Sequence, residues 1–236
     1  MNSPKQIAVV FLGSAVVLAL LAFWFHSMNA PANLGLTEND EEFNIDAPVP
    51  AEELQRVNEQ ATTENTMNPT AIFTTNRGVI AIELYEDVMP ITVGNFTKLA
   101  EAGFYNDTKF HRVIDGFMIQ GGDPNSKSDN PATYGQGGPG YTIQDEFIEE
   151  PRLTNTRGSI AMANTGQPNS GGSQFFINTV DNVGLDFNKP PAASSHPVFG
   201  RVVNGMDVVD AISDTATGPG DLPVEPVIIQ SVTIQR

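Results

Sequence analysis

The chain has 236 residues, of which 40% are apolar and 17% are charged, with 12 Lys and Arg, 28 Asp and Glu, three His and no Cys. The lack of cysteine excludes disulfides, thiolate metal sites and cysteine nucleophiles. The net charge of −16 argues against nucleic-acid binding, which needs clustered basic side chains. We therefore expect no nucleic-acid partner, no metal site and no cofactor.

The first feature of the chain is an uncharged run of nineteen residues from Ile7 to Phe25, within residues 1–30. At about 1.5 Å per residue, a helix of this length covers nearly all of the roughly 30 Å hydrocarbon thickness of a bilayer. The base Lys5 precedes the run and acids follow it, which favours a cytoplasmic N-terminus. The prediction is a membrane anchor with the rest of the chain outside the cytoplasm. The alternative is a signal peptide that is cleaved to release the protein.

Residues 31–68 carry nine acids against one base, and Phe43 is the only aromatic residue among them. Such a segment cannot bury enough apolar surface to offset its ordering entropy. It is predicted to be an acidic flexible linker. The remaining residues, 69–236, are long enough for one folded domain.

Short apolar runs dominate this domain. The runs 71–75 and 79–84 flank Asn76-Arg77-Gly78 and predict a hairpin. One helix is expected to begin at Pro90 and a second to cover Met206 to Ile212, because apolar residues recur there at helical spacing. Many short strands and few helices favour a closed antiparallel sheet or a sandwich. The other expected strands are Lys109–Val113, Phe117–Gln120, Ser159–Ala163, Gln174–Asn178, Val198–Val202 and Val227–Thr233.

Two clusters, 110–123 and 158–178, carry the residues best suited to chemistry. If the first begins as a regular strand, Phe110 and Arg112 share one face and His111 lies on the other. The second joins an apolar strand to a returning strand through a polar loop rich in Gly, Asn and Ser. Together they could place one cation, amides and large apolar side chains close to one another.

Several common catalytic motifs are missing. The sequence contains no G-x-S-x-G elbow and no H-E-x-x-H pair, and GQGGPG at 135–140 lacks the Lys that a P-loop requires. The adjacent acids Asp145-Glu146 and Glu149-Glu150 are predicted to form a solvated face.

Three segments resemble the signature blocks of cyclophilins, the cyclosporin-binding class of peptidyl-prolyl cis–trans isomerases: FHRVIDGFMIQGGDP, GSIAMANTGQPNSGGSQFFIN and HPVFGRVVNGMDVVDAI. The resemblance covers residues 70–235, and GQGGPGYTIQDEF is most similar to bacterial members. It implies a mainly β fold, a closed eight-stranded antiparallel β-barrel capped by two α-helices. With the predicted anchor, the expected location is a bacterial inner membrane, with the catalytic domain facing the periplasm.

The resemblance also implies a set of site residues. Arg112 matches the catalytic arginine. Gly184 stands where many eukaryotic members have Trp, and the loop from Asp186 to His196 is longer than usual, so cyclosporin binding is expected to be weakened. The implied catalytic residues are Arg112, Phe117 and Gln120, and the implied substrate-binding residues are Met118, Ala163, Asn164, Gln174, Phe176, Leu185 and His196.

The expected activity is rotation of X–Pro bonds in extracytoplasmic proteins, which assists their folding. The partners would be proline-containing segments of client proteins and, through the N-terminal helix, the membrane. One alternative is a proline-peptide-binding chaperone or docking module with little turnover. Another is a structural subunit of a membrane complex. Without the resemblance, Arg112 would be read as a surface ion-pair partner, and Phe117, Met118 and Phe176 as core.

Overall fold

The computed structural model describes residues 68–189 and 195–236. The predicted anchor at 1–30 and nearly all of the predicted linker at 31–68 lie outside these ranges. Within them, the chain forms no helix whose length and apolar content would suit a bilayer span.

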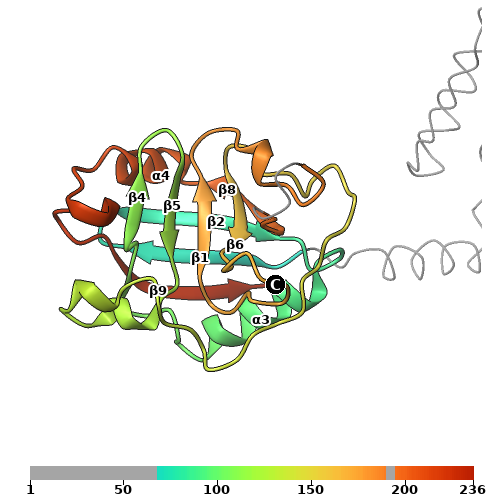
Figure 1. Ribbon diagram of the computed structural model, residues 1–236, viewed down its shortest axis with the longest axis horizontal. Coiled ribbons are helices and arrows are strands. Elements are labelled where there is room, and N and C mark those ends of the chain that lie inside the picture. The colour runs from blue at the N-terminus through green and yellow to red at the C-terminus, as the bar shows by residue number, and fades with distance from the viewer. Residues whose placement is uncertain (1–67, 190–194) are drawn as a thin grey trace, which may run out of the picture. The chain divides into compact units, whose positions relative to one another are not determined.

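The described residues form one curled antiparallel sheet of nine strands, in the order β3-β9-β1-β2-β8-β6-β7-β5-β4, with two α-helices. In Figure 1 the strands β4, β5 and β6 stand upright in front of β1, β2 and β9, while α4 lies at the top and α3 at the bottom. The predicted mainly β architecture with two helices is confirmed. The elements are β1 (Thr70–Thr75), β2 (Gly78–Leu84), α3 (Pro90–Glu101), β3 (Thr108–Lys109), β4 (Arg112–Ile114), β5 (Met118–Gly121), β6 (Ser159–Met162), β7 (Phe175–Asn178), β8 (Val198–Asn204), α4 (Met206–Ser213) and β9 (Ile228–Gln235), with short 3-10 helices η1 (Pro124–Lys127), η2 (Pro131–Thr133), η3 (Val183–Leu185) and η5 (Pro219–Asp221).

The predicted hairpin is present, with Thr75 paired to Gly78 and the register running back to Thr70 opposite Glu83. Its side chains alternate strictly between buried and partly exposed along β1, where Ala71 and Phe73 are fully buried. This period of two follows from the pleat, which points successive side chains to opposite faces. One face of the hairpin therefore supplies the core.

The strand predicted at Lys109–Val113 is instead divided into β3 and β4, which is one reason the sheet has nine strands rather than eight. The chain changes partner between two residues: Phe110 N–H donates to Val227 O of the segment leading into β9 at 2.9 Å, and His111 N–H donates to Gln120 O of β5 at 3.0 Å. The strands at the two edges of the sheet, β3 and β4, are therefore formed by one continuous segment of the chain.

Because of this change of partner, the prediction that Phe110 and Arg112 share one face of a regular strand is wrong. Phe110 is fully buried in the core, and so is Val113 at 1% exposure, although they are three residues apart. Regular alternation would bury residues two apart, so the alternation slips by one residue at the point where the partner changes. As a result Arg112 is partly exposed beside a buried Val113, and it does not share a face with Phe110.

Helix α3 begins at Pro90, as predicted, and buries Val93 and Phe96. Its first turn is capped from a distant part of the chain, because the Glu146 carboxylate accepts from the backbone N–H of Ile91 at 3.0 Å and of Thr92 at 2.6 Å. A carboxylate at a helix N-terminus satisfies free donors and complements the helix dipole. The prediction that Glu146 lies on a solvated face is therefore wrong, since it is only 9% exposed.

Aromatic rings fill the centre of the molecule. Phe96 stacks on Tyr105 with ring centroids 5.0 Å apart, and Phe175 of β7 meets Phe73 edge-on at 5.5 Å. Offset-stacked and edge-to-face arrangements are the favoured ones for aromatic pairs. The cluster fixes β7 from the inside.

Candidate active site

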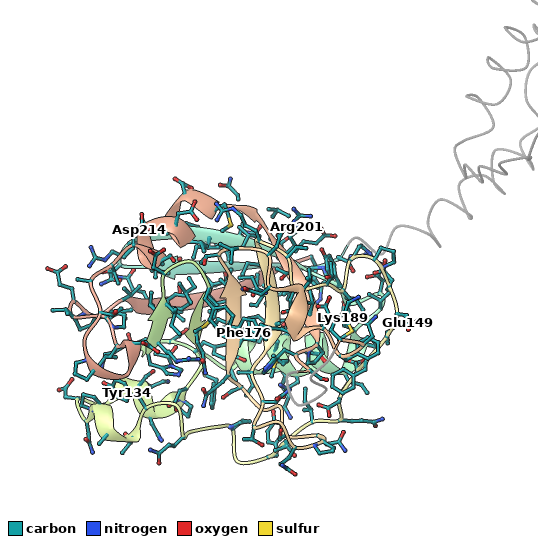
Figure 2. All side chains as sticks on the ribbon, turned by 45° about the horizontal axis from the view of Figure 1, so that its top comes forward. Tyr134, Glu149, Phe176, Lys189, Arg201 and Asp214 are labelled. Carbon is teal, nitrogen blue, oxygen red and sulfur yellow. The ribbon has the colours of Figure 1, made fainter. Side chains whose placement is uncertain are left out.

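The strands bring the candidate residues into one row. In the sheet register Arg112 of β4 lies opposite Gln120 of β5, Gln120 lies opposite Phe176 of β7, and Phe176 lies opposite Ala161 of β6. Directly paired residues have Cβ atoms about 4.5–5.5 Å apart and point to the same face. The cation, the amide and the aromatic ring are therefore neighbours because of strand pairing (Figure 2 labels Phe176 near the middle of this face).

A chain of polar contacts runs along this row. Arg112 Nη1 donates to Gln120 Oε1 at 3.5 Å, and Gln120 Nε2 donates to Gln174 Oε1 at 3.1 Å. Gln174 Nε2 in turn donates to the carbonyl oxygens of Gly135 at 3.0 Å and Gly137 at 2.9 Å. Because each amide has its oxygen and nitrogen assigned by these partners, the two glutamines have defined orientations.

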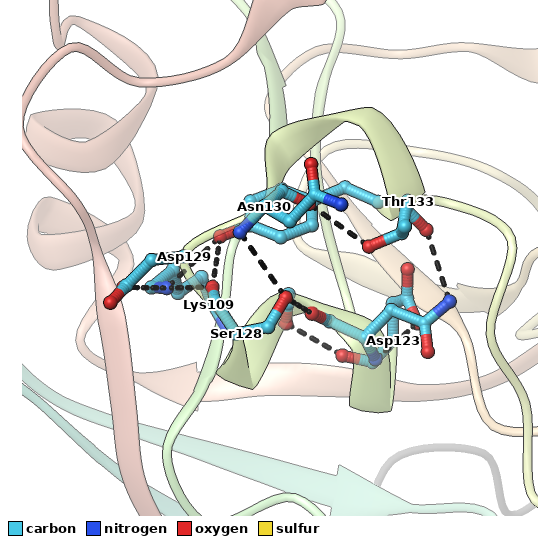
Figure 3. A network of polar contacts seen from close by, with 9 residues as sticks. Lys109, Asp123, Ser128, Asp129, Asn130 and Thr133 are labelled. Atoms are coloured by element: carbon cyan, nitrogen blue, oxygen red, sulfur yellow. Dashed lines mark hydrogen bonds and ion pairs between the residues drawn. The ribbon is translucent and has the colours of Figure 1, made fainter.

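The loop that holds Gln174 is itself tightly bonded (Figure 3). Asp123 is fully buried, and its carboxylate accepts from the backbone N–H groups of Asn125, at 2.8 Å, and of Gly135. The residue after η1 is also bonded to β3, because Lys109 Nζ donates to Ser128 O at 2.9 Å. Asp123 was not among the predicted site residues. Its signal in the sequence is an acid directly before a proline, which is typical of the N-cap of a helical turn.

A cavity of about 540 Å³ opens beside the row. Its wall includes Gln120, Ala163, Asn164 and Gln174, the four residues that the resemblance assigns to binding the peptide backbone. Asn164 Nδ2 donates to Ser195 O at 2.6 Å, so this hydrogen bond orients the Asn164 amide. The structure therefore gathers these four residues at one place, with the amide groups of three of them held by hydrogen bonds.

The apolar residues predicted for the site, Phe117, Met118, Phe176 and Leu185, belong to the core or pack against it. The Phe176 ring is 5% exposed and meets the His196 ring edge-on, with centroids 5.3 Å apart. Met118 is buried at 2% exposure, while Phe117 and Leu185 are half-buried and pack on the same core. His196 N–H donates to Leu185 O at 2.9 Å, which ties these two residues together.

His196 is suited to packing rather than to proton transfer. Burial lowers its pKa, and the hydrogen bond of its Nδ1 to Met162 O at 3.0 Å opposes this shift only in part. A histidine whose pKa is below its ordinary value of about 6.5 is neutral at pH 7. With Nδ1–H as the donor to Met162, the ring presents a neutral edge to Phe176.

The structure also places Asp221 beside Arg112, a contact that the sequence did not predict. Arg112 Nε donates to Asp221 Oδ2 at 3.3 Å, across a separation of 109 residues. Asp221 lies in a Gly-Pro-Gly-Asp turn, which reads in the sequence only as a surface loop. No local signal connects it with Arg112.

The model of the family "Cyclophilin type peptidyl-prolyl cis-trans isomerase/CLD" matches residues 70–234. The chain belongs to this family. Among curated cyclophilins, peptidyl-prolyl cis-trans isomerase B of Escherichia coli is 46% identical over 169 residues, covering 70% of this chain and 98% of the relative. The probable peptidyl-prolyl cis-trans isomerase A of Mycobacterium leprae is 42% identical over 184 residues, covering 71% and 92%.

Solved cyclophilin structures agree. A Cryptosporidium parvum cyclophilin-type isomerase, crystallised in the presence of the dipeptide Ala-Pro, superposes with a TM-score of 0.61 and 30% identity, covering 71% of this chain and 99% of that one. The present cyclophilin is thus a peptidyl-prolyl cis–trans isomerase, as its three sequence blocks predicted.

Proposed function

We propose that this cyclophilin rotates X–Pro bonds in extracytoplasmic client proteins, with Arg112 as the catalytic side chain. The observation that supports this best is the row of Arg112, Gln120 and Phe176 across three paired strands. It sets a permanent cation and an apolar ring on one face, with only Gln120 between them in the sheet register. Family membership and the Ala-Pro dipeptide in the related crystal support proline-containing segments as ligands.

The reaction needs no bond to be made or broken. Rotation about a peptide bond costs about 18–20 kcal/mol because its resonance is lost, and uncatalysed X–Pro exchange takes tens to hundreds of seconds. In the twisted state the prolyl nitrogen regains its lone pair and can accept a hydrogen bond. Arg112 would donate that bond, which forms only in the twisted state and therefore lowers the barrier.

One hydrogen bond cannot supply the whole effect, since a charge-assisted bond contributes about 1.5–3 kcal/mol. The remainder would come from holding the two sides of the bond differently. Phe117, Met118, Phe176, Leu185 and His196 would grip the pyrrolidine ring. The backbone before the proline would bind to Gln120, Ala163, Asn164 and Gln174 at the neighbouring cavity.

The extracytoplasmic location rests on the uncharged run from Ile7 to Phe25 and the charge difference around it. In bacterial cells that produce the full chain, we expect the protein in the membrane fraction and its isomerase domain degraded when protease is added to spheroplasts. A domain that is degraded only after the inner membrane is broken would contradict the proposal. Recovery in the soluble periplasmic fraction, with a new N-terminus after residue 30, would support the location but replace the anchor by a signal peptide.

The proposal also predicts that an aromatic ring introduced directly before Leu185 strengthens cyclosporin binding. Gly184 is exposed, and a Cβ placed there meets nothing within 4 Å. Gly184→Trp should therefore fold normally and tighten cyclosporin binding about tenfold or more, as a well-placed aromatic contact does. Fluorescence titration measures the Kd. Gly94→Trp, on the outer side of α3 with equally open surroundings, is the matched control and should leave the Kd unchanged. Equal affinities for both variants would show that position 184 lies outside the cyclosporin site.

A further inference from the structure

The guanidinium of Arg112 is held at two of its three nitrogens. Nε donates to Asp221 Oδ2 at 3.3 Å and Nη1 donates to Gln120 Oε1 at 3.5 Å. Nη2 has no hydrogen-bond partner among residues 68–189 and 195–236. A guanidinium is planar and rigid, so two anchored nitrogens fix the direction of the third.

The two anchors differ in strength. At 3.5 Å the contact with Gln120 is at the limit of a hydrogen bond. The contact with Asp221 is shorter and joins opposite charges, which makes it the stronger one. Asp221 therefore contributes most to the orientation of Arg112.

The loop that carries Asp221 is built to hold it in place. Gly218 N–H donates to Leu222 O at 2.8 Å, and Thr217 pairs with Pro223, so the turn is closed at its base. Asp221 itself has a φ of +59°, in the left-handed region, which most residues other than Gly, Asn and Asp rarely adopt. The turn thus presents the carboxylate to Arg112 from a fixed backbone.

We propose that Asp221 is a positioning residue, which holds Nε of Arg112 so that Nη2 is directed at the prolyl nitrogen of the bound client. This inference rests on the proposed catalytic role of Arg112. It assigns to Asp221 an effect on turnover through Arg112, without contact with the client. The pair is not required for folding, because both side chains are more than 40% exposed and surface ion pairs contribute little to stability.

The test measures kcat and KM separately by NMR exchange spectroscopy, over a range of concentrations of an Ala-Pro tetrapeptide. Asp221→Ala should lower kcat about tenfold and leave KM within about twofold, since misplacing a catalytic group affects the rate more than the binding. Asp221→Asn should keep most of the activity, because its amide oxygen still accepts from Nε. Asp221→Gly, which adopts a positive φ without strain, should behave like Asp221→Ala.

A matched control is available on α4. Asp210 pairs with Arg157 at 2.7 Å, with side-chain exposures of 42% and 45%, close to the 46% and 42% of Asp221 and Arg112. Asp210→Ala should leave kcat unchanged and shift Tm as little as Asp221→Ala does. The Nε–H signal of Arg112 should exchange faster with water in Asp221→Ala than in the wild type or in Asp210→Ala.

The outcomes separate this inference from the proposal on which it rests. If Arg112→Ala is as active as the wild type, the catalytic role of Arg112 fails and the role of Asp221 fails with it. If Arg112→Ala is impaired while Asp221→Ala and Asp221→Gly keep the wild-type kcat, the positioning role alone is overturned. It is also overturned if Asp221→Ala costs the same factor in the Arg112→Ala background, because the two residues then act independently.

Discussion

Arg112→Ala is expected to lower kcat/KM for an Ala-Pro peptide by about two orders of magnitude. A charge-assisted hydrogen bond of about 1.5–3 kcal/mol corresponds to a factor of roughly 10–150, and the alanine variant loses the whole of it in the twisted state. Arg112 is partly exposed and makes two polar side-chain contacts within the described part of the chain, so the variant should fold normally. A protease-coupled assay, or NMR exchange where the coupled assay is too slow, gives the rate.

Two further variants sharpen this result. Arg112→Lys keeps the charge but lacks the planar fork, so it cannot bond Asp221, Gln120 and the client together, and only a small part of the activity should return. Arg157→Ala removes an arginine of similar exposure that pairs with Asp210 of α4 and is not among the site residues, and it should be fully active. A rate for Arg112→Ala within about twofold of the wild type would contradict the proposed electrostatic role of Arg112.

The sequence predicts the elements of this fold well where a short local pattern decides them. The hairpin of β1 and β2 follows from two apolar runs around Gly78, and α3 follows from Pro90 and the apolar spacing after it. Arg112 and Gln120 also belong to one continuous block of sequence that folds back on itself, and their roles were implied by the resemblance of that block to cyclophilins.

What the sequence could not predict depends on contacts between distant segments. Glu146 caps a helix that begins 56 residues earlier, at Pro90, and in the sequence it looks like any surface acid. Asp221 reaches Arg112 across 109 residues. The slip in alternation after Phe110 arises because the chain pairs first with β9 and then with β5. The sequence of one strand does not show which other strand it pairs with. These misses share a cause: each depends on a tertiary contact that overrides a local preference.

The second large effect is expected at β7, whose adjacent residues Phe175 and Phe176 point to opposite sides of the sheet. Phe176 belongs to the candidate site, where its ring meets His196, whereas Phe175 is fully buried and contacts Phe73, Phe96 and Tyr105 with centroids 5.5–5.9 Å apart. Alternation along the strand therefore separates a side chain that holds the client from one that holds the fold.

Phe175→Ala should lower the free energy of unfolding by about 3–5 kcal/mol, the usual cost of emptying a ring-sized space in a packed core. That is a large share of the roughly 5–15 kcal/mol available to a domain, and Tm should fall by about 10 °C or more. Urea unfolding followed by circular dichroism measures the change. Phe147→Ala is the control, because this ring is 39% exposed and stacks only on Phe187 at 5.4 Å among the ring contacts of the described residues, so its loss should cost about 1 kcal/mol or less. Equal losses in the two variants would mean that the central ring cluster does not hold β7 in place.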